Sequence, residues 1–322
     1  MAIDLGYGYL KGVNDQGERV LFPSVVAPAR DLLLADLSRN STGYAARIQR
    51  VSGAMERAFV GDLALREGRG VGFTLERNKL RHPAHDVLLL TAARLLWTGR
   101  PCRLVVGLPV AYYRSQRDMV RKYLSGLAAH VEVDDRAQEW VTFDDVLVYP
   151  QGVGALLTVQ GLPTAGLVGV VDVGYKTTDY VVAECYPDTV RPVSTLCGSI
   201  EFGAYTVRQA VQDEFLRLTG APLDNAVLPM VLQTGTVTFR SRPIDLRHAL
   251  DRAREEVAQA IADRLFAAWD TRGDFLQKVY LAGGGVLEIP LLKRLFPGAE
   301  ILGDAQFANA AGFLKAAMAS RG

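Results

Sequence analysis

The motif Ile3-Asp4-Leu5-Gly6-Tyr7 stands near the start of this chain, and Val171-Asp172-Val173-Gly174-Tyr175 repeats it near the middle. Apolar residues precede each copy, and a second strand-like run follows it, at residues 9–13 and 178–182. A strand that ends in Asp-x-Gly and is followed at once by another strand predicts a β-hairpin with glycine near its tip. Two such hairpins predict a duplicated fold.

The chemistry of these hairpin tips favours phosphate. Glycine lets backbone N–H groups approach a ligand closely, and rows of such groups bind anions. The aspartate next to them can hold hydrated Mg²⁺. A single Asp-x-Gly-Tyr is explained at least as well by an ordinary turn, because Asp and Gly are common turn residues. Two copies in matching contexts favour a pair of hairpins that bind one polyphosphate from opposite sides.

The two copies differ in the residues that follow the motif. Seven positions after the aspartate, the first copy has Lys11 and the second has Asp179. Lys11 offers a positive charge and three donors to a phosphate tail. The second copy instead has Thr177 and Thr178, whose hydroxyl groups can donate to phosphate oxygens or orient a water molecule.

A third motif is the apolar run of residues 278–282, which leads into Gly283, Gly284 and Gly285 and then into a helix predicted to start near Glu288. Backbone without side chains at a strand-to-helix turn can accept a flat or anionic group. Three glycines alone are also consistent with a flexible turn. The chain has no Gly-x-x-x-x-Gly-Lys-Ser/Thr loop, and Lys11 stands where a dinucleotide fingerprint starting at Gly6 needs its third glycine.

In this order, the motifs resemble those of the actin/Hsp70/sugar-kinase ATPase superfamily. Its first phosphate loop resembles Asp4-x-Gly6 with Lys11, its second resembles Asp172-x-Gly174 through Asp179, and its adenosine motif resembles the triple glycine. Its two connecting helices resemble those expected after Tyr149-Pro150-Gln151-Gly152 and at Ala308-Asn309-Ala310-Ala311-Gly312. The resemblance spans nearly the whole chain.

Further stretches resemble the prokaryotic actin-like group, which includes plasmid-segregation ParM-type proteins and their archaeal relatives. They are Asp4-x-Gly6-Tyr7-Gly8, Phe22-Pro23-Ser24-Val25, Phe59-Val60-Gly61-Asp62-Leu63-Ala64 and Val106-Gly107-Leu108-Pro109. This resemblance implies an α/β, actin-like (ribonuclease H-like) duplicated two-domain fold, with a nucleotide cleft between mixed sheets.

The resemblance also implies a set of site residues. Asp4 and Asp172 would hold Mg²⁺ mainly through water, and Asp172 would also take part in catalysis. By sequence alone Gln151 is a polar residue at a helix start, but the resemblance implies that it positions the attacking water. The implied nucleotide-binding residues are Asp4, Gly6, Tyr7, Gly8, Tyr9, Lys11, Gly174, Tyr175, Lys176, Thr177, Thr178, Gly283, Gly284 and Gly285.

One departure from the family pattern concerns Tyr175 and Lys176, because many members have further glycines at these positions. The side chain of Tyr175 would narrow the phosphate tip, or Lys176 would add a second positive charge to it. Either change would alter nucleotide affinity or the rate of hydrolysis.

Composition agrees with a globular ATPase. The 322 residues suffice for two domains with substantial cores, and a net charge of +1 provides no general attraction to nucleic acid or to an anionic membrane. The three cysteines and four histidines show no zinc spacing. The most apolar predicted helix, at residues 87–97, contains Arg94 and is too short to span a membrane. The first strand begins almost at Met1, so we expect no signal peptide and a cytoplasmic protein.

The duplication sets the expected domain boundaries. Domain I is predicted at residues 1–157 plus 304–322, with a small insertion at about 30–75, and domain II at residues 158–303, with a small insertion at about 220–245. Alternating strands and helices in each half favour two α/β domains. Helices are expected at 82–97, 114–129, 204–218, 246–269 and 308–319, and strands at 103–108, 167–172, 178–185 and 192–196.

The favoured function is a filament-forming, actin-like ATPase that binds ATP or GTP with Mg²⁺ and associates head to tail with itself. It would move or segregate plasmid DNA through a DNA-binding adaptor, without direct contact to nucleic acid. The basic residues Arg114, Arg117, Arg121 and Lys122 are interpreted as a solvated helix face or an intersubunit surface rather than a DNA site. Two alternatives share the fold: a monomeric phosphotransferase of the sugar-kinase type, and a non-polymerising nucleotide-binding scaffold.

Overall fold

A computed structural model describes residues 1–32, 43–68, 82 and 84–319 of the chain. Its contacts divide the chain into two compact units. Unit 1 comprises Met1–Leu108, Tyr113–Tyr149 and Phe313–Gly322, and unit 2 comprises Pro109–Tyr112 and Pro150–Gly312. The domain boundaries expected after residues 157 and 303 remain predictions. Residues 33–42 and 69–75 of the first expected insertion lie outside the described part of the chain.

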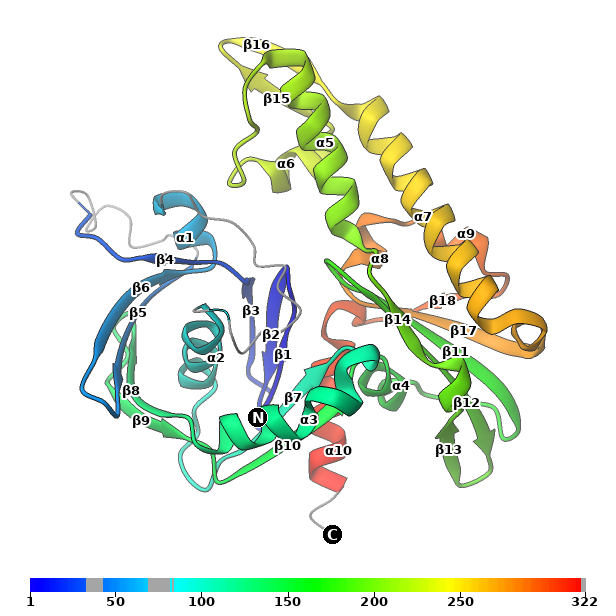
Figure 1. The fold of residues 1–322 in the computed structure, drawn as a ribbon, viewed down its shortest axis with the longest axis horizontal. Helices are drawn as coiled ribbons and strands as arrows, with labels where there is room; N and C mark the ends of the chain where they lie inside the picture. The colour runs from blue at the N-terminus through cyan, green and yellow to red at the C-terminus, as the bar shows by residue number, and fades with distance from the viewer. Residues whose placement is uncertain (33–42, 69–81, 83, 320–322) are drawn as a thin grey trace. The chain divides into compact units, whose positions relative to one another are not determined.

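The central sheet of unit 1 contains the first motif (Figure 1). Its strand order is β10-β7-β1-β2-β3, in which β1 runs antiparallel to β2 and parallel to β7. All four residues of β1 are buried, which fits an apolar strand in the middle of a sheet. The strands are β1 (Ala2–Leu5), β2 (Tyr9–Val13), β3 (Arg19–Pro23), β7 (Arg103–Leu108) and β10 (Asp145–Pro150).

A second sheet of unit 1 curves around helix α2 (Ala84–Leu95) (Figure 1). Every residue of α2 from 87 to 95 is buried, because the helix packs against strands of both sheets. A helix that is apolar on all sides requires such enclosure. The second sheet has the order β4 (Val26–Pro28), β6 (Met55–Val60), β5 (Tyr44–Arg50), β8 (Ala128–Val133) and β9 (Glu139–Thr142). Short helix α1 (Asp62–Glu67) follows β6.

Unit 2 repeats the plan of the first sheet. β11 (Gly166–Val173) pairs antiparallel with β12 (Thr178–Tyr186) and parallel with β17 (Leu276–Ala282), as β1 pairs with β2 and β7. This shared topology is the structural form of the sequence duplication. The sheet is completed by β13 (Thr189–Pro192), β14 (Gly198–Ile200) and β18 (Glu300–Ile301).

Helices cover the sheet of unit 2. The long helices α5 (Ala204–Thr219) and α7 (Arg247–Trp269) pack side by side and contribute to one large core. A separate apolar cluster joins strands β11 and β12 to α4 (Val153–Thr158) and to the start of α10 (Ala308–Ala319). The remaining short helices are η3 (Ser194–Leu196), η4 (Asp270–Phe275), α8 (Gly285–Glu288), α9 (Leu292–Leu295) and η5 (Ala305–Phe307).

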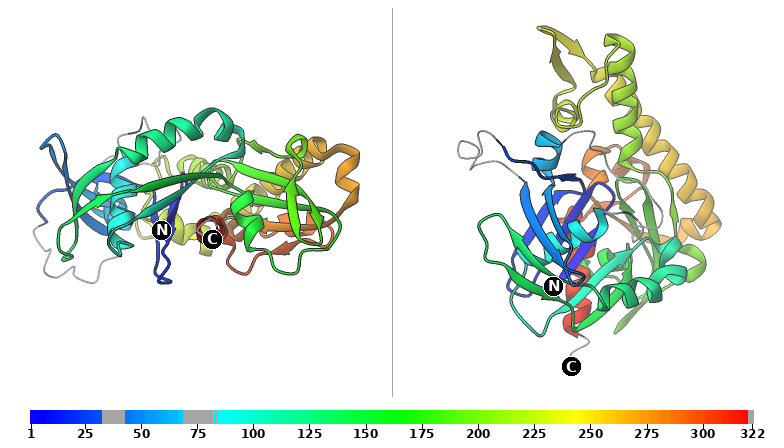
Figure 2. Two further views of the ribbon diagram at one scale, coloured as in Figure 1. Left: turned by 90° about the horizontal axis from the view of Figure 1, so that it is seen from below. Right: turned by 60° about the vertical axis from the view of Figure 1, so that its left-hand side comes forward.

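The expected insertion at 220–245 forms a small body at the C-terminal end of α5 and the N-terminal end of α7 (Figures 1 and 2). It contains helix α6 (Leu228–Thr234) and the hairpin of β15 (Thr236–Phe239) and β16 (Arg242–Asp245). The ring of Phe239 packs edge-on against that of Phe215 in α5, with centroids 5.3 Å apart. This contact attaches the insertion to the helix that precedes it.

The expected secondary structure is wrong at residues 126–129 and 194–196. The helix predicted to reach residue 129 is α3 (Val110–Ser125), which ends before Gly126, and β8 begins two residues later. Alternate residues 129, 131 and 133 of that strand face the core. The strand predicted at 192–196 is a 3₁₀ turn, η3, that follows Pro192 and places Leu196 in the core.

Candidate functional site

The first Asp-x-Gly hairpin lies between β1 and β2 of unit 1. Asp4 and Lys11 occupy opposite positions of the two strands, and Lys11 Nζ lies 3.5 Å from Asp4 Oδ2. The N–H group of Gly6 donates to the carbonyl oxygen of Tyr9 at 3.1 Å. A Cβ atom at Gly6 would lie 2.6 Å from this oxygen and 3.0 Å from Lys11 Nζ. The lysine ammonium therefore lies directly over a tip that only glycine can form.

The Asp4–Lys11 pair is almost buried, since Asp4 is 4% and Lys11 9% exposed. Taking two charges out of water is costly unless each has partners. In this structure each charge of the pair has the other as a partner at the hairpin tip.

Ser24 supports this hairpin from the end of β3. Its N–H group donates to the carbonyl of Gly8 at 2.9 Å, and its hydroxyl donates to the carbonyl of Gly6 at 2.7 Å. The side chain of Tyr7 is buried, while Tyr9 is half-buried. In the sequence Ser24 is only part of a motif typical of the family, so its role as a support of the tip was missed.

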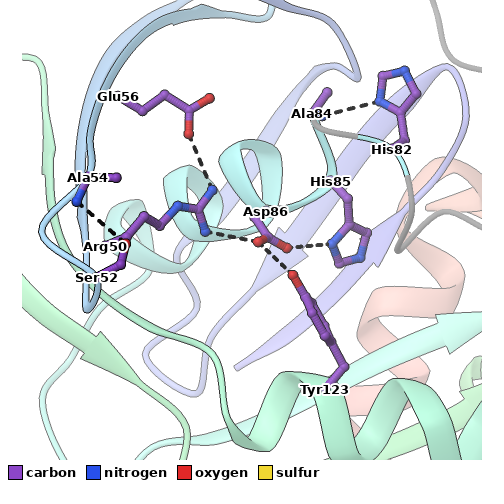
Figure 3. A network of polar contacts seen from close by, with 9 residues as sticks. All are labelled: Arg50, Ser52, Ala54, Glu56, His82, Ala84, His85, Asp86 and Tyr123. Atoms are coloured by element: carbon purple, nitrogen blue, oxygen red, sulfur yellow. Dashed lines mark hydrogen bonds and ion pairs between the residues drawn. The ribbon is translucent and has the colours of Figure 1, made fainter.

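A polar network lies next to the hairpin, at the start of α2 (Figure 3). The carboxylate of Asp86 accepts hydrogen bonds from Arg50 of β5 at 2.9 Å and from Tyr123 of α3 at 2.7 Å. His85 Nδ1 lies 3.0 Å from the other oxygen of Asp86, and Arg50 also pairs with Glu56. The network thus joins β5, β6, α2 and α3.

The network perturbs the two acids at its centre. Burial alone would raise the pKa of Asp86, but hydrogen bonds from His85 and Tyr123 and the charge of Arg50 lower it below its ordinary value. Burial, together with the hydrogen bond to Asp86, raises the pKa of Tyr123 to about 12. His85 also lines a cavity of about 10 Å³ shared with Gly6.

The second Asp-x-Gly hairpin lies between β11 and β12 of unit 2. Its turn is closed by the N–H group of Gly174, which donates to the carbonyl of Thr177 at 2.9 Å. A Cβ atom at Gly174 would lie 2.9 Å from that same oxygen, so this tip also requires glycine. Tyr175 and Lys176 at the tip are half-buried, and Asp172 is buried.

Asn309 of α10 joins Asp172 to the segment that contains Gln151. Its Nδ2 donates to Asp172 Oδ2 at 2.6 Å, while its Oδ1 accepts the N–H groups of Gly152 at 2.9 Å and Ala155 at 3.2 Å. Both side-chain polar atoms of this buried asparagine thus make hydrogen bonds. From the sequence, Asn309 was expected only as part of a connecting helix. The available signal for its role was that it is the one asparagine at the start of an alanine-rich helix.

Two helices approach closely at this point because both have glycine there. A Cβ atom at Gly312 of α10 would lie 1.8 Å from the carbonyl oxygen of Gly154 in α4. Gly152, at the N-terminal cap of α4, has φ of 77°, a conformation that favours glycine. These glycines bring the segment that contains Gln151 close to Asn309, which in turn binds Asp172, all within unit 2.

Both threonine hydroxyl groups of the second hairpin contact other groups of the fold. Thr178 is fully buried and donates to the carbonyl of Phe202 at 2.8 Å, and Thr177 lies 3.4 Å from Asp179 Oδ2. Asp179 Oδ1 accepts the N–H group of Val110 at 2.7 Å, which caps the first turn of α3. Contact of either threonine with phosphate remains a prediction.

The triple-glycine loop packs on the second hairpin. Gly283 has φ of 87°, and a Cβ atom there would lie 2.3 Å from the carbonyl oxygen of Val173 and 2.4 Å from Asp172 Oδ1. A Cβ atom at Gly285 would lie 2.7 Å from the carbonyl oxygen of Val173. The helix expected to start near Glu288 instead ends there, because α8 is a single turn that starts at Gly285.

That Asp4 of unit 1 and Asp172 of unit 2 hold Mg²⁺ remains a prediction, with which the chemistry of both side chains agrees. Asp4 and Asp172 offer hard carboxylate oxygens, and Mg²⁺ is commonly held by one or two carboxylates, waters and substrate phosphates. In the part of the chain that the structure describes, no cluster of three His, Cys, Asp or Glu side chains could hold a metal by itself. Within the same part, no helix is long and apolar enough to cross a membrane.

A duplicated hairpin sheet, a glycine loop and two close-packed connecting helices define an actin-like protein, and the comparisons with known proteins agree. Residues 2–154 match the family of actin-like proteins, N-terminal domain, and residues 170–293 match the archaeal actin homologue MreB-like C-terminal family. The chain belongs to the prokaryotic actin-like group of the actin/Hsp70/sugar-kinase superfamily.

Individual relatives match over almost their whole length. An archaeal actin homolog of Thermoplasma acidophilum is 25% identical, with 98% of both chains covered. A 15-stranded ParM filament from Clostridium botulinum has a TM-score of 0.89 at 25% identity, covering 99% of this chain and 98% of that one. An archaeal actin homolog in complex with ADP has a TM-score of 0.77 at 22% identity, covering 98% of each chain. The last likeness concerns the fold alone.

Proposed function

We propose that this protein is a nucleotide-dependent, filament-forming actin-like ATPase. The observation that carries the proposal is the pair of glycine-tipped hairpins, each with a buried aspartate at the end of an equivalent strand. In this proposal Asp4 and Asp172 face each other across a nucleotide that lies between the two domains. The similarity to a ParM filament supports it.

The chain's residues have distinct tasks in the proposed site. Lys11 leaves Asp4 to bind the phosphate tail, and the N–H groups of the second tip, with Lys176, bind the terminal phosphate. Gly283, Gly284 and Gly285 accept the adenosine or guanosine against bare main chain. Mg²⁺, when bound, supplies positive charge to the phosphates, and Asp4 and Asp172 hold it mainly through water.

Hydrolysis requires a water molecule in line with the terminal phosphate, and Gln151 is the proposed residue that orients it. Asn309 makes hydrogen bonds both to Asp172 and to the N-terminus of α4. In this proposal these bonds fix the distance between Gln151, which orients the water, and Asp172, which binds the metal. Asp172 would contribute to hydrolysis by holding Mg²⁺ through water beside the phosphates. No step requires a second substrate.

Assembly would proceed head to tail, because contact between two different surfaces produces an open helix. We place the longitudinal contacts at the two insertions, residues 30–75 and 220–245. With a net charge of only +1, the protein would attach to plasmid DNA through a DNA-binding adaptor in the cytoplasm. The nucleotide controls polymer length if the filament binds the ATP-bound conformation more tightly.

Light scattering of the purified protein tests this function. The signal should rise on addition of Mg-ATP or Mg-GTP and fall as phosphate is released. Asp172→Ala should abolish this cycle, because the metal loses a carboxylate, while circular dichroism stays unchanged. A wild-type protein that binds nucleotide but stays monomeric would contradict the filament. ADP release that depends on a small acceptor would then identify a phosphotransferase, and its absence a scaffold.

A further inference from the structure

The main chain of α5 is attached to the tip of the second hairpin. The N–H groups of Ala204 and Tyr205 donate to the carbonyls of Gly174 at 3.1 Å and Tyr175 at 2.7 Å. A Cβ atom at Gly203 would lie 2.6 Å and 2.8 Å from the same two carbonyl oxygens. The hairpin tip thus satisfies the first N–H groups of α5, which would otherwise lack partners. Movement of the tip therefore moves this helix.

The side chain of Tyr175 extends this attachment. Its ring centroid lies 5.5 Å from that of Tyr205, and the guanidinium carbon of Arg208 lies 5.2 Å from the same ring. Arg208 is only 4% exposed, and a desolvated cation over an aromatic face is held more strongly than an exposed one. The residue that departs from the family's glycine pattern is therefore an anchor for a buried arginine.

Arg208 also binds the end of α8. Its Nη2 lies 2.5 Å from Glu288 Oε1, and its Nε lies 3.3 Å from Glu288 Oε2. This two-point contact matches the planar guanidinium group, whereas a lysine ammonium would make a single-point contact. The carbonyl of Glu288 in turn accepts a hydrogen bond from Arg254 of α7 at 2.9 Å.

The contacts form a closed ring. α8 starts at Gly285, whose backbone packs on the carbonyls of Val173 and Gly174, and it ends at Glu288. From Glu288 the path returns through Arg208 and Tyr175 to the hairpin tip. The glycine loop and the phosphate hairpin therefore cannot shift independently while this ring is intact.

We propose that Tyr175, Arg208 and Glu288 are positioning residues that couple recognition of the terminal phosphate to the glycine loop. The proposal rests on the nucleotide binding proposed above and adds a regulatory path to that site. When a terminal phosphate draws the tip towards itself, the ring transmits the shift to α8 and to α5. Because α5 leads into the insertion at 220–245, the same shift reaches the region where we place filament contacts.

The test measures binding rather than turnover. Dissociation constants for a non-hydrolysable ATP analogue and for ADP, both with Mg²⁺, are determined by titration calorimetry for the wild type and for Tyr175→Leu, Glu288→Gln and the double variant. Each single change should reduce the preference for the triphosphate, measured as the dissociation constant for ADP divided by that for the ATP analogue, by about tenfold, equivalent to about 1.4 kcal/mol. The double variant should lose no more of this preference than either single variant, because the two changes interrupt the same ring of contacts.

Glu214→Gln is the matched control, because Glu214 of α5 pairs with Arg217 outside this ring of contacts, so the variant should keep the wild-type ratio. Arg208→Lys keeps the charge but loses the two-point contact, so its ratio should fall. Thermal unfolding without nucleotide identifies any variant that fails to fold. If the other variants fail to fold, Glu288→Gln alone tests the coupling, because it replaces only a partly exposed carboxylate. An unchanged ratio in Glu288→Gln, or additive losses in the double variant, would overturn the coupling. A wild type that binds neither nucleotide would instead refute the proposed function.

Discussion

At the scale of single residues, Gln151 is the proposed group for the slow chemical step. Gln151→Ala should reduce the single-turnover rate of phosphate release on the order of 10²-fold, because the attacking water loses its orientation. Nucleotide affinity should change little, so nucleotide-bound assemblies should persist for longer. Rapid-quench measurement of phosphate release provides the test. An unchanged rate would exclude this role.

Asn309 has a different role, since it positions two groups without needing to touch the nucleotide. Asn309→Ala leaves the buried N–H groups of Gly152 and Ala155 without their acceptor, which should reduce the free energy of unfolding by about 1–3 kcal/mol. Chemical denaturation measures this loss. Asn225→Ala is the control, because Asn225 is half-exposed and contacts Gln212. If Asn309→Ala were no more destabilising than this control, the support role would be wrong.

At the scale of elements, the glycine loop and the second hairpin pack so closely that a side chain at the contact would collide with the opposite backbone. Gly285→Ala would place a Cβ atom 2.6 Å from Val173 Cγ1 and 2.7 Å from the carbonyl oxygen of Val173. We expect loss of nucleotide affinity by at least about tenfold, because the two elements must separate. Gly303→Ala, whose Cβ would meet no atom within 4 Å, should bind as the wild type does. Fluorescence titration with a labelled nucleotide compares the two variants.

The network around Asp86 predicts a pH dependence of stability in unit 1. The pKa of Asp86 is lowered in the folded state, so its contribution is present above the ordinary carboxyl pKa of about 4 and is lost as the pH falls through the folded value. Thermal unfolding of Asp86→Asn should therefore be less dependent on pH below about 4 than that of the wild type. Parallel pH slopes for the two proteins would contradict the prediction.

Several elements could be predicted from the sequence because their patterns are local. The strand at 103–108 and the helices at 204–218 and 246–269 have clear periodicity, and β7, α5 and α7 lie there. Strand β8 was missed because its partner β5 lies more than 70 residues earlier in the chain, and β9, which pairs with β8, was missed with it. Pairing over such distances leaves no short-range signal.

At the scale of the whole molecule, assembly tests the surfaces assigned to the insertions. Met230 of α6 is 46% exposed and lies in the insertion at 220–245. Met230→Lys should prevent sedimentation with Mg-ATP, because a charge would be buried in an apolar contact, while nucleotide affinity stays unchanged. Met318→Lys is the matched control, since Met318 is 54% exposed but lies in α10. Equal sedimentation of both variants would place the contacts elsewhere.

The sequence by itself determined the class of this protein, because the motifs typical of the actin-like group are short runs of contiguous residues rich in glycine and aspartate. Asp4, Lys11, Asp172 and the triple glycine could all be identified without coordinates. Only the tertiary structure showed the groups that join these motifs, such as Ser24, Asn309 and the Arg208–Glu288 pair. Their partners lie 18, 137 and 80 positions away along the chain, so their roles depend on distances that only folding creates.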